Sequence, residues 1–215
     1  MWCFQKHRKY ITIGDITMNL DKLFSNLEKG GIATKYFETK EAAAEYLASS
    51  ITGKKVALGG SMTLKEMGVY EALSGSNEVF WHWLDLEADR KAPTNAAEVY
   101  LCSANGIAET GEIFNIDGHG NRVAGSFYTP DYSYFIVGVN KIKPDLASAI
   151  DYARNVASPL NAKRLNAKTP CAVNADKCYD CDSPSRICRI ATTIYKKPMA
   201  VKHMELIVVG ENLGY

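Results

Sequence analysis

Strand-like runs alternate with helical patterns over the first half of the chain, and this rhythm restricts the fold more than any other feature. Residues 32–37 alternate like a strand, and an alanine-rich helix is expected over residues 40–50. A short apolar strand over residues 54–58 then leads into another helical pattern. Because parallel strands need a crossover connection, which is usually a helix, this alternation predicts an α/β fold. We expect a mainly parallel sheet with helices on both faces.

Beyond residue 99 the pattern changes to short β-like runs. Two of them, residues 112–116 and 122–124, flank the sequence Asp-Gly-His-Gly-Asn at residues 117–121. A glycine-rich segment between short apolar runs indicates a β-hairpin, so the sheet is expected to be mixed. A further helix is expected over residues 144–157 and a last strand over residues 206–209.

Length and charge set broad limits on the class of protein. The chain has 215 residues and a formal net charge of +1, which gives no reason to expect nucleic acid or an anionic membrane as a partner. No apolar stretch approaches the ~20 residues of a membrane helix. The basic N-terminus lacks the apolar segment of a secretory signal. We therefore expect a cytoplasmic α/β domain over residues 19–215, preceded by a disordered arm over residues 1–18.

A glycine turn at residues 59–63 is the first candidate site. It reads Gly-Gly-Ser-Met-Thr and lies between an expected strand and an expected helix. In open α/β sheets, ligands bind at the carboxyl ends of strands, and glycines let the backbone approach a ligand closely. Free N–H groups at a helix start favour phosphate or carboxylate. The alternative is a tight strand-to-helix connection in which Thr63 caps the helix. The candidate ligand-binding residues are Gly59, Gly60, Ser61 and Thr63.

A polar segment at residues 109–122 is the second candidate. Its two glutamates, Glu109 and Glu112, are a pair suited to acid–base chemistry, and Arg122 is suited to holding an anionic substrate. For Asp117 and His119 taken alone, we favour a solvated turn. The candidate ligand-binding residues in this segment are Asn115, Asn121 and Arg122.

Longer segments carry a resemblance to a known family. The sequence AETGEIFNIDGHGNRVAGSFYTPDYSYFIVGVNKI, with GGSMTLKEMGVYEAL upstream and SPLNAKRLNAKTPC downstream, resembles the LUD-domain family, named for lactate utilisation. The resemblance spans about residues 20–215. It implies the fold of the superfamily that includes ribose-5-phosphate isomerase, glucosamine-phosphate deaminase and CoA-transferases. Those proteins hold a phosphate or CoA-type ligand in a glycine-rich turn, a role that would fall here on residues 59–63.

Four cysteines form the third candidate site, within an expected Cys-rich insertion over residues 169–190. Two residues separate the middle pair and six separate each outer pair. Such spacing and the surrounding turn-forming residues favour metal ligation, and either zinc or a four-iron cluster accepts four cysteines. Reduced, inert thiols and a redox pair at the two middle cysteines remain alternatives. The candidate metal ligands are Cys171, Cys178, Cys181 and Cys188.

Three functions follow from these patterns and from the resemblance. Characterised LUD relatives are subunits of a bacterial iron–sulfur system that oxidises L-lactate to pyruvate. The first function is therefore an accessory or redox subunit that binds a small organic anion and works with partner subunits. The second is a stand-alone enzyme of the isomerase or CoA-transferase type, with Glu109 or Glu112 as base and structural zinc. The third is a non-catalytic ligand-binding or assembly protein. The sequence leaves the oligomeric state open, including a homo-oligomer.

Overall fold

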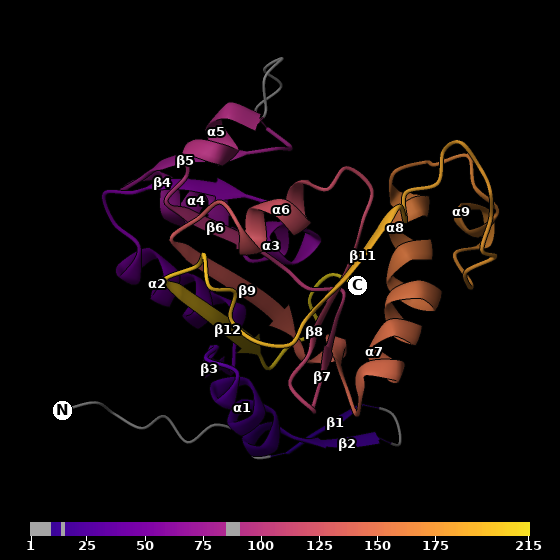
Figure 1. Ribbon diagram of the computed structural model, residues 1–215, viewed down its shortest axis with the longest axis horizontal. Helices are drawn as coiled ribbons and strands as arrows, with labels where there is room; N and C mark the ends of the chain where they lie inside the picture. Colours follow the sequence, from indigo (N-terminus) through magenta and orange to yellow (C-terminus); the bar gives the residue numbers. More distant parts are fainter. Residues whose placement is uncertain (1–9, 14–15, 85–90) are drawn as a thin grey trace.

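A large parallel sheet forms the centre of the molecule (Figure 1). The computed structural model describes residues 10–13, 16–84 and 91–215. Within those residues the large sheet has six strands, all parallel, in the order β3-β12-β9-β6-β4-β5. The mainly parallel α/β architecture expected from the sequence is therefore confirmed. The strands are β3 (Ala33–Phe37), β4 (Lys55–Leu58), β5 (Glu78–Trp81), β6 (Val99–Cys102), β9 (Tyr132–Gly138) and β12 (His203–Val209).

The large sheet is apolar on both faces, which is why its strands read as nearly continuous hydrophobic runs. In β12, Leu206 and Val208 join one core cluster, whereas Ile207 and Val209 join the other. Helices α2 (Lys40–Ser50) and α4 (Val69–Ser74) contribute to the second cluster through residues such as Leu47 and Leu73. In the part of the chain that is described, no helix is both long and apolar enough to cross a bilayer.

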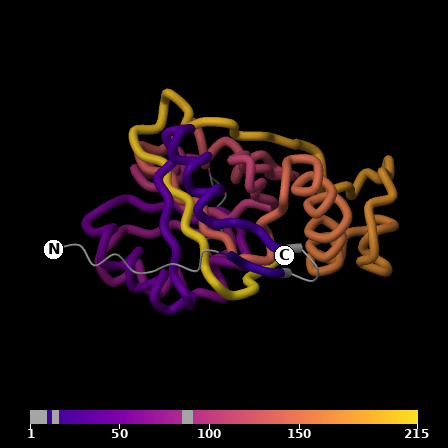
Figure 2. The backbone as a smooth tube through the Cα atoms, turned by 90° about the horizontal axis from the view of Figure 1, so that it is seen from below, coloured from indigo at the N-terminus to yellow at the C-terminus, as the bar shows by residue number. Residues whose placement is uncertain are grey.

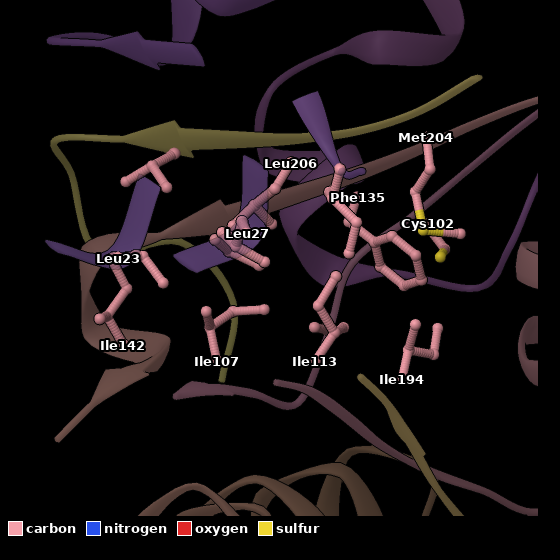
Figure 3. Packing of buried hydrophobic residues seen from close by; sticks show 14 of the residues in the cluster. Leu23, Leu27, Cys102, Ile107, Ile113, Phe135, Ile142, Ile194, Met204 and Leu206 are labelled. Carbon is pink, nitrogen blue, oxygen red and sulfur yellow. The ribbon is translucent and has the colours of Figure 1, made fainter. Parts of the chain in front are cut away.

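A small mixed sheet covers the other face of the large one. In the described residues its order is β10-β7-β8-β11, with β7 and β10 parallel and the other pairs antiparallel. Figure 3 shows Ile113 of this sheet near Phe135 of the large sheet and Ile107 near Leu27 of helix α1 (Leu20–Lys29), all in one core cluster. Leu23 of α1 lies in the same core cluster. The strands are β7 (Gly106–Ala108), β8 (Ile113–Asp117), β10 (Ile142–Lys143) and β11 (Ile190–Ile194).

A long helical segment leads to the cysteines. Helix α7 (Leu146–Tyr152) continues through a π-helix, η2 (Ala153–Ala157), into α8 (Ser158–Arg164). Helix α9 (Pro170–Asn174) follows and begins the Cys-rich segment, which we define as residues 169–190. Both views place this segment at one end of the molecule, beyond α8 (Figures 1 and 2). The remaining elements are β1 (Tyr10–Ile13), β2 (Ile16–Asn19), α3 (Met62–Glu66), α5 (Lys91–Ala96), α6 (Asn121–Phe127) and η1 (Val139–Lys141).

The predicted hairpin is present but lies elsewhere in the sequence. Strands β7 and β8 pair antiparallel, so residues 109–112 make the connection. The expected turn at residues 117–121 leads instead into α6, and Arg122 is helical rather than extended. The cause is Asp117, whose carboxylate is 6% exposed and accepts backbone N–H groups at the start of α6. The interpretation of Asp117 as part of a solvated turn was therefore wrong.

The N-terminal arm also differs from expectation over part of its length. Strands β1 and β2 form an antiparallel pair, and the side chains of Ile11 and Met18 are buried in the core. The expected disorder does not hold for residues 10–13 and 16–18. Residues 1–9 and 14–15 lie outside the described residues.

Asp117→Ala is expected to destabilise the protein by about 3 kcal/mol, because it leaves several backbone N–H groups at the start of α6 without an acceptor. The Asp117 carboxylate accepts from the backbone nitrogens of His119 at 3.0 Å, Gly120 at 3.1 Å, Arg122 at 3.0 Å and Val123 at 3.2 Å. Urea denaturation would measure the loss in unfolding free energy.

Asp145→Ala is the matched control for that change. Asp145 caps α7 through one bond from the Ser148 backbone nitrogen at 2.8 Å, and it is exposed. Its replacement should cost only about 1 kcal/mol. Equal losses for the two variants would show that Asp117 is an ordinary helix cap.

Candidate functional site

A cleft of about 1370 Å³ lies between the large sheet and the Cys-rich segment. Its walls include residues just beyond the carboxyl ends of neighbouring strands: Gly60, two residues after β4, His82 after β5 and Ser103 after β6. Ligands of open α/β sheets bind at this edge. Residues of α8 and of the Cys-rich segment, such as Arg164 and Arg186, line the cleft as well.

Both glycines of the turn are required by close packing. A Cβ atom at Gly60 would lie 2.5 Å from Nε1 of Trp83, and one at Gly59 would lie 2.8 Å from the Tyr100 hydroxyl. Real Cβ atoms do not approach other atoms so closely. A larger residue at position 60 would therefore force Trp83 to move. Gly60 lines the cleft, as the ligand-binding prediction requires.

The two hydroxyl residues of the turn take different positions. Ser61 lines the cleft, and its Oγ accepts a hydrogen bond from the Leu64 backbone nitrogen at 3.3 Å, so Ser61 is the cap of α3. The alternative in which Thr63 caps the helix was wrong. Thr63 is fully buried, and its Oγ1 bonds inward to the backbone oxygen of Leu213 at 3.2 Å.

Arg122 lines the cleft and is held rigidly. Its guanidinium donates to the Ser103 backbone oxygen at 3.4 Å, to Asn105 Oδ1 at 3.3 Å and to the Ile116 backbone oxygen. Its side chain is only 15% exposed. These contacts fix a cation at the floor of the cleft before any ligand arrives.

The two asparagines differ in their access to the cleft. Asn121 lines it, and its backbone oxygen accepts a bond from the Tyr100 hydroxyl at 3.2 Å. Asn115 is 2% exposed and supports the floor from below, since its Oδ1 accepts from the Asn105 backbone nitrogen at 3.1 Å.

Lys141 is a cleft residue that the sequence did not reveal. Its Nζ donates to Thr63 Oγ1 and to Ser103 Oγ, each at 2.9 Å. The residue is 3% exposed, yet it lines the cleft. Burial, aided by the nearby charge of Arg122, lowers the pKa of Lys141 to about 7. No motif marks this lysine; the only local signal is its position just after the apolar strand β9.

The cleft carries a strong excess of positive charge. Among its described lining residues, the only acid is Asp117, whose oxygens already accept backbone N–H groups. Arg164 lies over the ring of Trp83, 4.8 Å from the centroid, and so joins α8 to the wall below. Such a field favours an anionic ligand. The basic lining residues are Lys91, Arg122, Lys141, Arg164, Arg186 and Arg189.

The four predicted cysteine ligands line a second, much smaller cavity, which we call the cysteine cavity. All four are free thiols. Cys178 Sγ accepts from the Asp180 backbone nitrogen at 3.4 Å and from Arg154 Nη2 at 3.8 Å. In residues 10–13, 16–84 and 91–215, no three His, Cys, Asp or Glu side chains are close enough together to enclose one metal ion. The cysteines that line the cavity are Cys171, Cys178, Cys181 and Cys188.

The π-helix η2 contacts Cys178 through two side chains. Arg154 and Asn155 belong to η2: Arg154 Nη2 donates to the Cys178 sulfur, and Asn155 Oδ1 accepts from the Cys178 backbone nitrogen at 3.0 Å. Such helix irregularities are rare and often lie at functional sites. Cysteine thiolates are the ligand type that zinc and iron–sulfur clusters prefer, but in the described residues no three of these side chains lie close enough together to enclose one ion.

The cleft and the cysteine cavity share a wall. Ser158, Arg186 and Ile187 line both. Arg186 donates through Nε to the Cys188 backbone oxygen and through Nη1 to the Cys181 backbone oxygen, each at 2.9 Å. One arginine therefore braces the cysteines and contributes its charge to the cleft.

The structure does not bring Glu109 and Glu112 to the cleft. Glu109 accepts from the Asn19 backbone nitrogen at 2.6 Å and pairs with Lys22 Nζ at 2.8 Å, at the start of α1. Burial acts to raise the pKa of Glu109, but the bonds from Lys22 and Asn19 leave it lowered, as for a structural carboxylate. Glu112 accepts from the Thr110 hydroxyl in the same connection. Their predicted acid–base role in the site is therefore corrected.

Comparison with known proteins agrees with this architecture. Residues 20–209 match the family model of the LUD domain. The chain is similar to a crystal structure of a DUF162 family protein from Deinococcus radiodurans, at 17% sequence identity and a TM-score of 0.51, over 89% of this chain and 96% of that one. At that identity the likeness concerns the fold. A search of curated proteins gives no match. Because the LUD match spans most of its length, the chain belongs to the LUD-domain family.

Proposed function

We propose that this lactate-utilisation-type protein is a redox subunit in the oxidation of L-lactate or a similar 2-hydroxy acid. Its cleft holds the organic anion or the phosphate of a cofactor, and its cysteine cavity holds an iron–sulfur cluster or zinc. Membership of the LUD family supports the pathway. Partner subunits would complete the electron path.

The observation that carries the proposal is the wall shared by the two cavities. Ser158, Arg186 and Ile187 border both the cleft and the cysteine cavity, so a ligand in one lies beside a group in the other. Electron transfer needs such proximity, whereas zinc that only stabilises a loop does not. This adjacency favours the redox interpretation over structural zinc.

The cleft suits a carboxylate but is large for a three-carbon acid. At about 1370 Å³ it exceeds the roughly 300–1,000 Å³ of common small-molecule sites. Arg122 at the floor suits the carboxylate, and Arg164 and Arg186 also line the cleft. The cleft therefore has room for a second anionic group, such as a cofactor phosphate.

The surroundings of the cysteines suit a negative metal centre. Four thiolates around zinc or an iron–sulfur core leave net negative charge, and Arg154 and Arg186 both line the cysteine cavity. An iron–sulfur cluster would supply one-electron transfer, whereas zinc would supply only structure. Arg154 and the Asp180 backbone nitrogen donate to the Cys178 sulfur, and such bonds tune cluster potentials.

Purification without oxygen, followed by metal and sulfide analysis, tests the proposal. We expect about four iron and four sulfide per chain and visible absorption that dithionite bleaches. Cys178→Ser should abolish this signal. Cys102→Ala is the matched control, because Cys102 is buried in the core and does not line the cysteine cavity. Zinc without iron would contradict the redox role, and a metal-free native protein would contradict the metal site.

A further inference from the structure

Lys141 occupies an unusual position for a lysine. Its amine lies at the floor of the cleft, bonded to the hydroxyls of Thr63 and Ser103, and the residue is 3% exposed. In the described part of the chain, no carboxylate lies within ion-pairing distance of it. Buried lysines usually have such a partner, because an unpaired buried charge is costly.

The groups around Lys141 favour its neutral amine. Burial and the positive charge of Arg122 act against protonation, while Glu66 and Cys102 act weakly in the other direction, and together they bring the pKa to about 7. A lysine that is desolvated and placed beside another cation is the arrangement that makes an amine nucleophilic at neutral pH.

We propose that Lys141 forms an imine with the carbonyl carbon of a small 2-oxo acid bound in the cleft. The cleft meets the two requirements of this chemistry: a lysine in its lining, and cations for the carboxylate. Arg122 and Arg164 both line the cleft with Lys141. The inference goes beyond the proposed function, because it requires neither a metal nor an electron transfer.

The reaction conserves atoms and electrons. The lone pair of Nζ attacks the carbonyl carbon, a C–N bond forms, and the C=O π electrons move to oxygen. Both hydrogens of the amine then pass to that oxygen, which leaves as water as the C=N bond forms. Thr63 Oγ1 and Ser103 Oγ, each 2.9 Å from Nζ, are placed to relay these protons. The net change is the loss of one water.

Reductive trapping tests the inference on the unaltered full-length protein. The protein is incubated with pyruvate and sodium borohydride, and its intact mass and peptide map are recorded. We expect one 1-carboxyethyl group per chain, located on Lys141, with trapping that rises as pH increases through about 7. L-lactate, which has no carbonyl, should give no adduct.

Lys143 provides an internal control for selectivity. It is also partly buried and its pKa is also lowered by burial, but its Nζ bonds to the Asn140 backbone oxygen and it does not line the cleft. Lys143→Arg should leave trapping unchanged, whereas Lys141→Arg should abolish it. Because the wild-type map locates the adduct, a variant that misfolds does not affect the test.

Two results would overturn the inference: no adduct on wild type, or adducts spread over surface lysines to the same extent as on Lys141. The Cys178→Ser protein separates this inference from the redox proposal. If it has lost its metal and still traps pyruvate on Lys141, the imine chemistry stands whatever becomes of the redox role.

Discussion

Lys141→Met is expected to raise the unfolding free energy at neutral pH by about 4 kcal/mol, the contribution of the lowered Lys141 pKa. The reason is the difference between the pKa of Lys141 in the folded protein, about 7, and the ordinary value of 10.5 in the unfolded chain. Methionine has a similar length and carries no charge to desolvate. Thr63 Oγ1 and Ser103 Oγ keep backbone acceptors at Leu213 and Ala104, so the change leaves both hydroxyls bonded.

The direction of the pH dependence follows from proton counting. Above pH 10.5 the amine is neutral in both states, and below about pH 7 it is protonated in both. Between these values the unfolded chain binds a proton that the folded protein does not. The unfolding free energy of wild type should therefore rise with pH in this window, by about 1.4 kcal/mol per unit relative to Lys141→Met.

Urea denaturation of both proteins at several values between pH 6 and 9.5 gives the measurement. The difference between the two curves isolates Lys141 from other titrating groups. Lys143→Met serves as the control and should show a smaller slope, because Lys143 is less buried. Parallel curves for wild type and Lys141→Met would mean that Lys141 keeps its proton in the folded protein, which would also remove the basis for its nucleophilic role.

A destabilising lysine in a cleft is typical of a functional group, since proteins tolerate such strain mainly where activity needs it. Local sequence patterns do not register this kind of group. Lys141 acquires its character from Thr63, Ser103 and Arg122, which lie 19 or more residues away along the chain. The sequence shows only a lysine after an apolar strand.

The parts of the fold that local pattern decides were predicted well. The alternation that marks α2 and β4 depends on side-chain periodicity within a few residues, so it can be read from the sequence. The segment at residues 117–121 was misjudged because its composition suits both a hairpin turn and a helix start. The choice depends on Asp117, whose carboxylate accepts the N–H groups at the start of α6, and Asp117 pairs with Ile190 of β11, which lies 73 positions further on.

The sequence predicted some residues of the candidate site and misplaced others. Gly60, Ser61 and Arg122 do line the cleft. The four cysteines line one small cavity, and their predicted role as metal ligands stays a prediction. The structure does not place Glu109 and Glu112 in the cleft as predicted, because residues that are close in sequence need not be close in space. Strand β8 separates them from Arg122, and a five-residue strand spans about 16 Å.

Arg186→Met is expected to impair both cavities at once. Its guanidinium bonds to the Cys181 and Cys188 backbone oxygens and to Asp180 Oδ1 at 3.2 Å. Without these bonds the Cys-rich segment is no longer held in place by Arg186, and we expect most of the bound metal to be lost on purification. The cleft loses one cation, so affinity for an anion should fall by about 10-fold, as for one charge-assisted hydrogen bond. Metal analysis and calorimetric titration with L-lactate and with inorganic phosphate would measure the two effects.

Arg189→Met is the matched control, because it separates the two roles that Arg186 combines. Arg189 also lines the cleft, but it donates to the backbone oxygens of Arg186 and Pro184 and does not line the cysteine cavity. Its replacement should weaken anion binding and leave the metal in place. If Arg186→Met behaves like Arg189→Met and retains its metal, the shared wall joins the two cavities in space but not in function. If it loses metal and anion affinity together, Arg186 is the physical link that a redox subunit needs between its ligand and its cysteines.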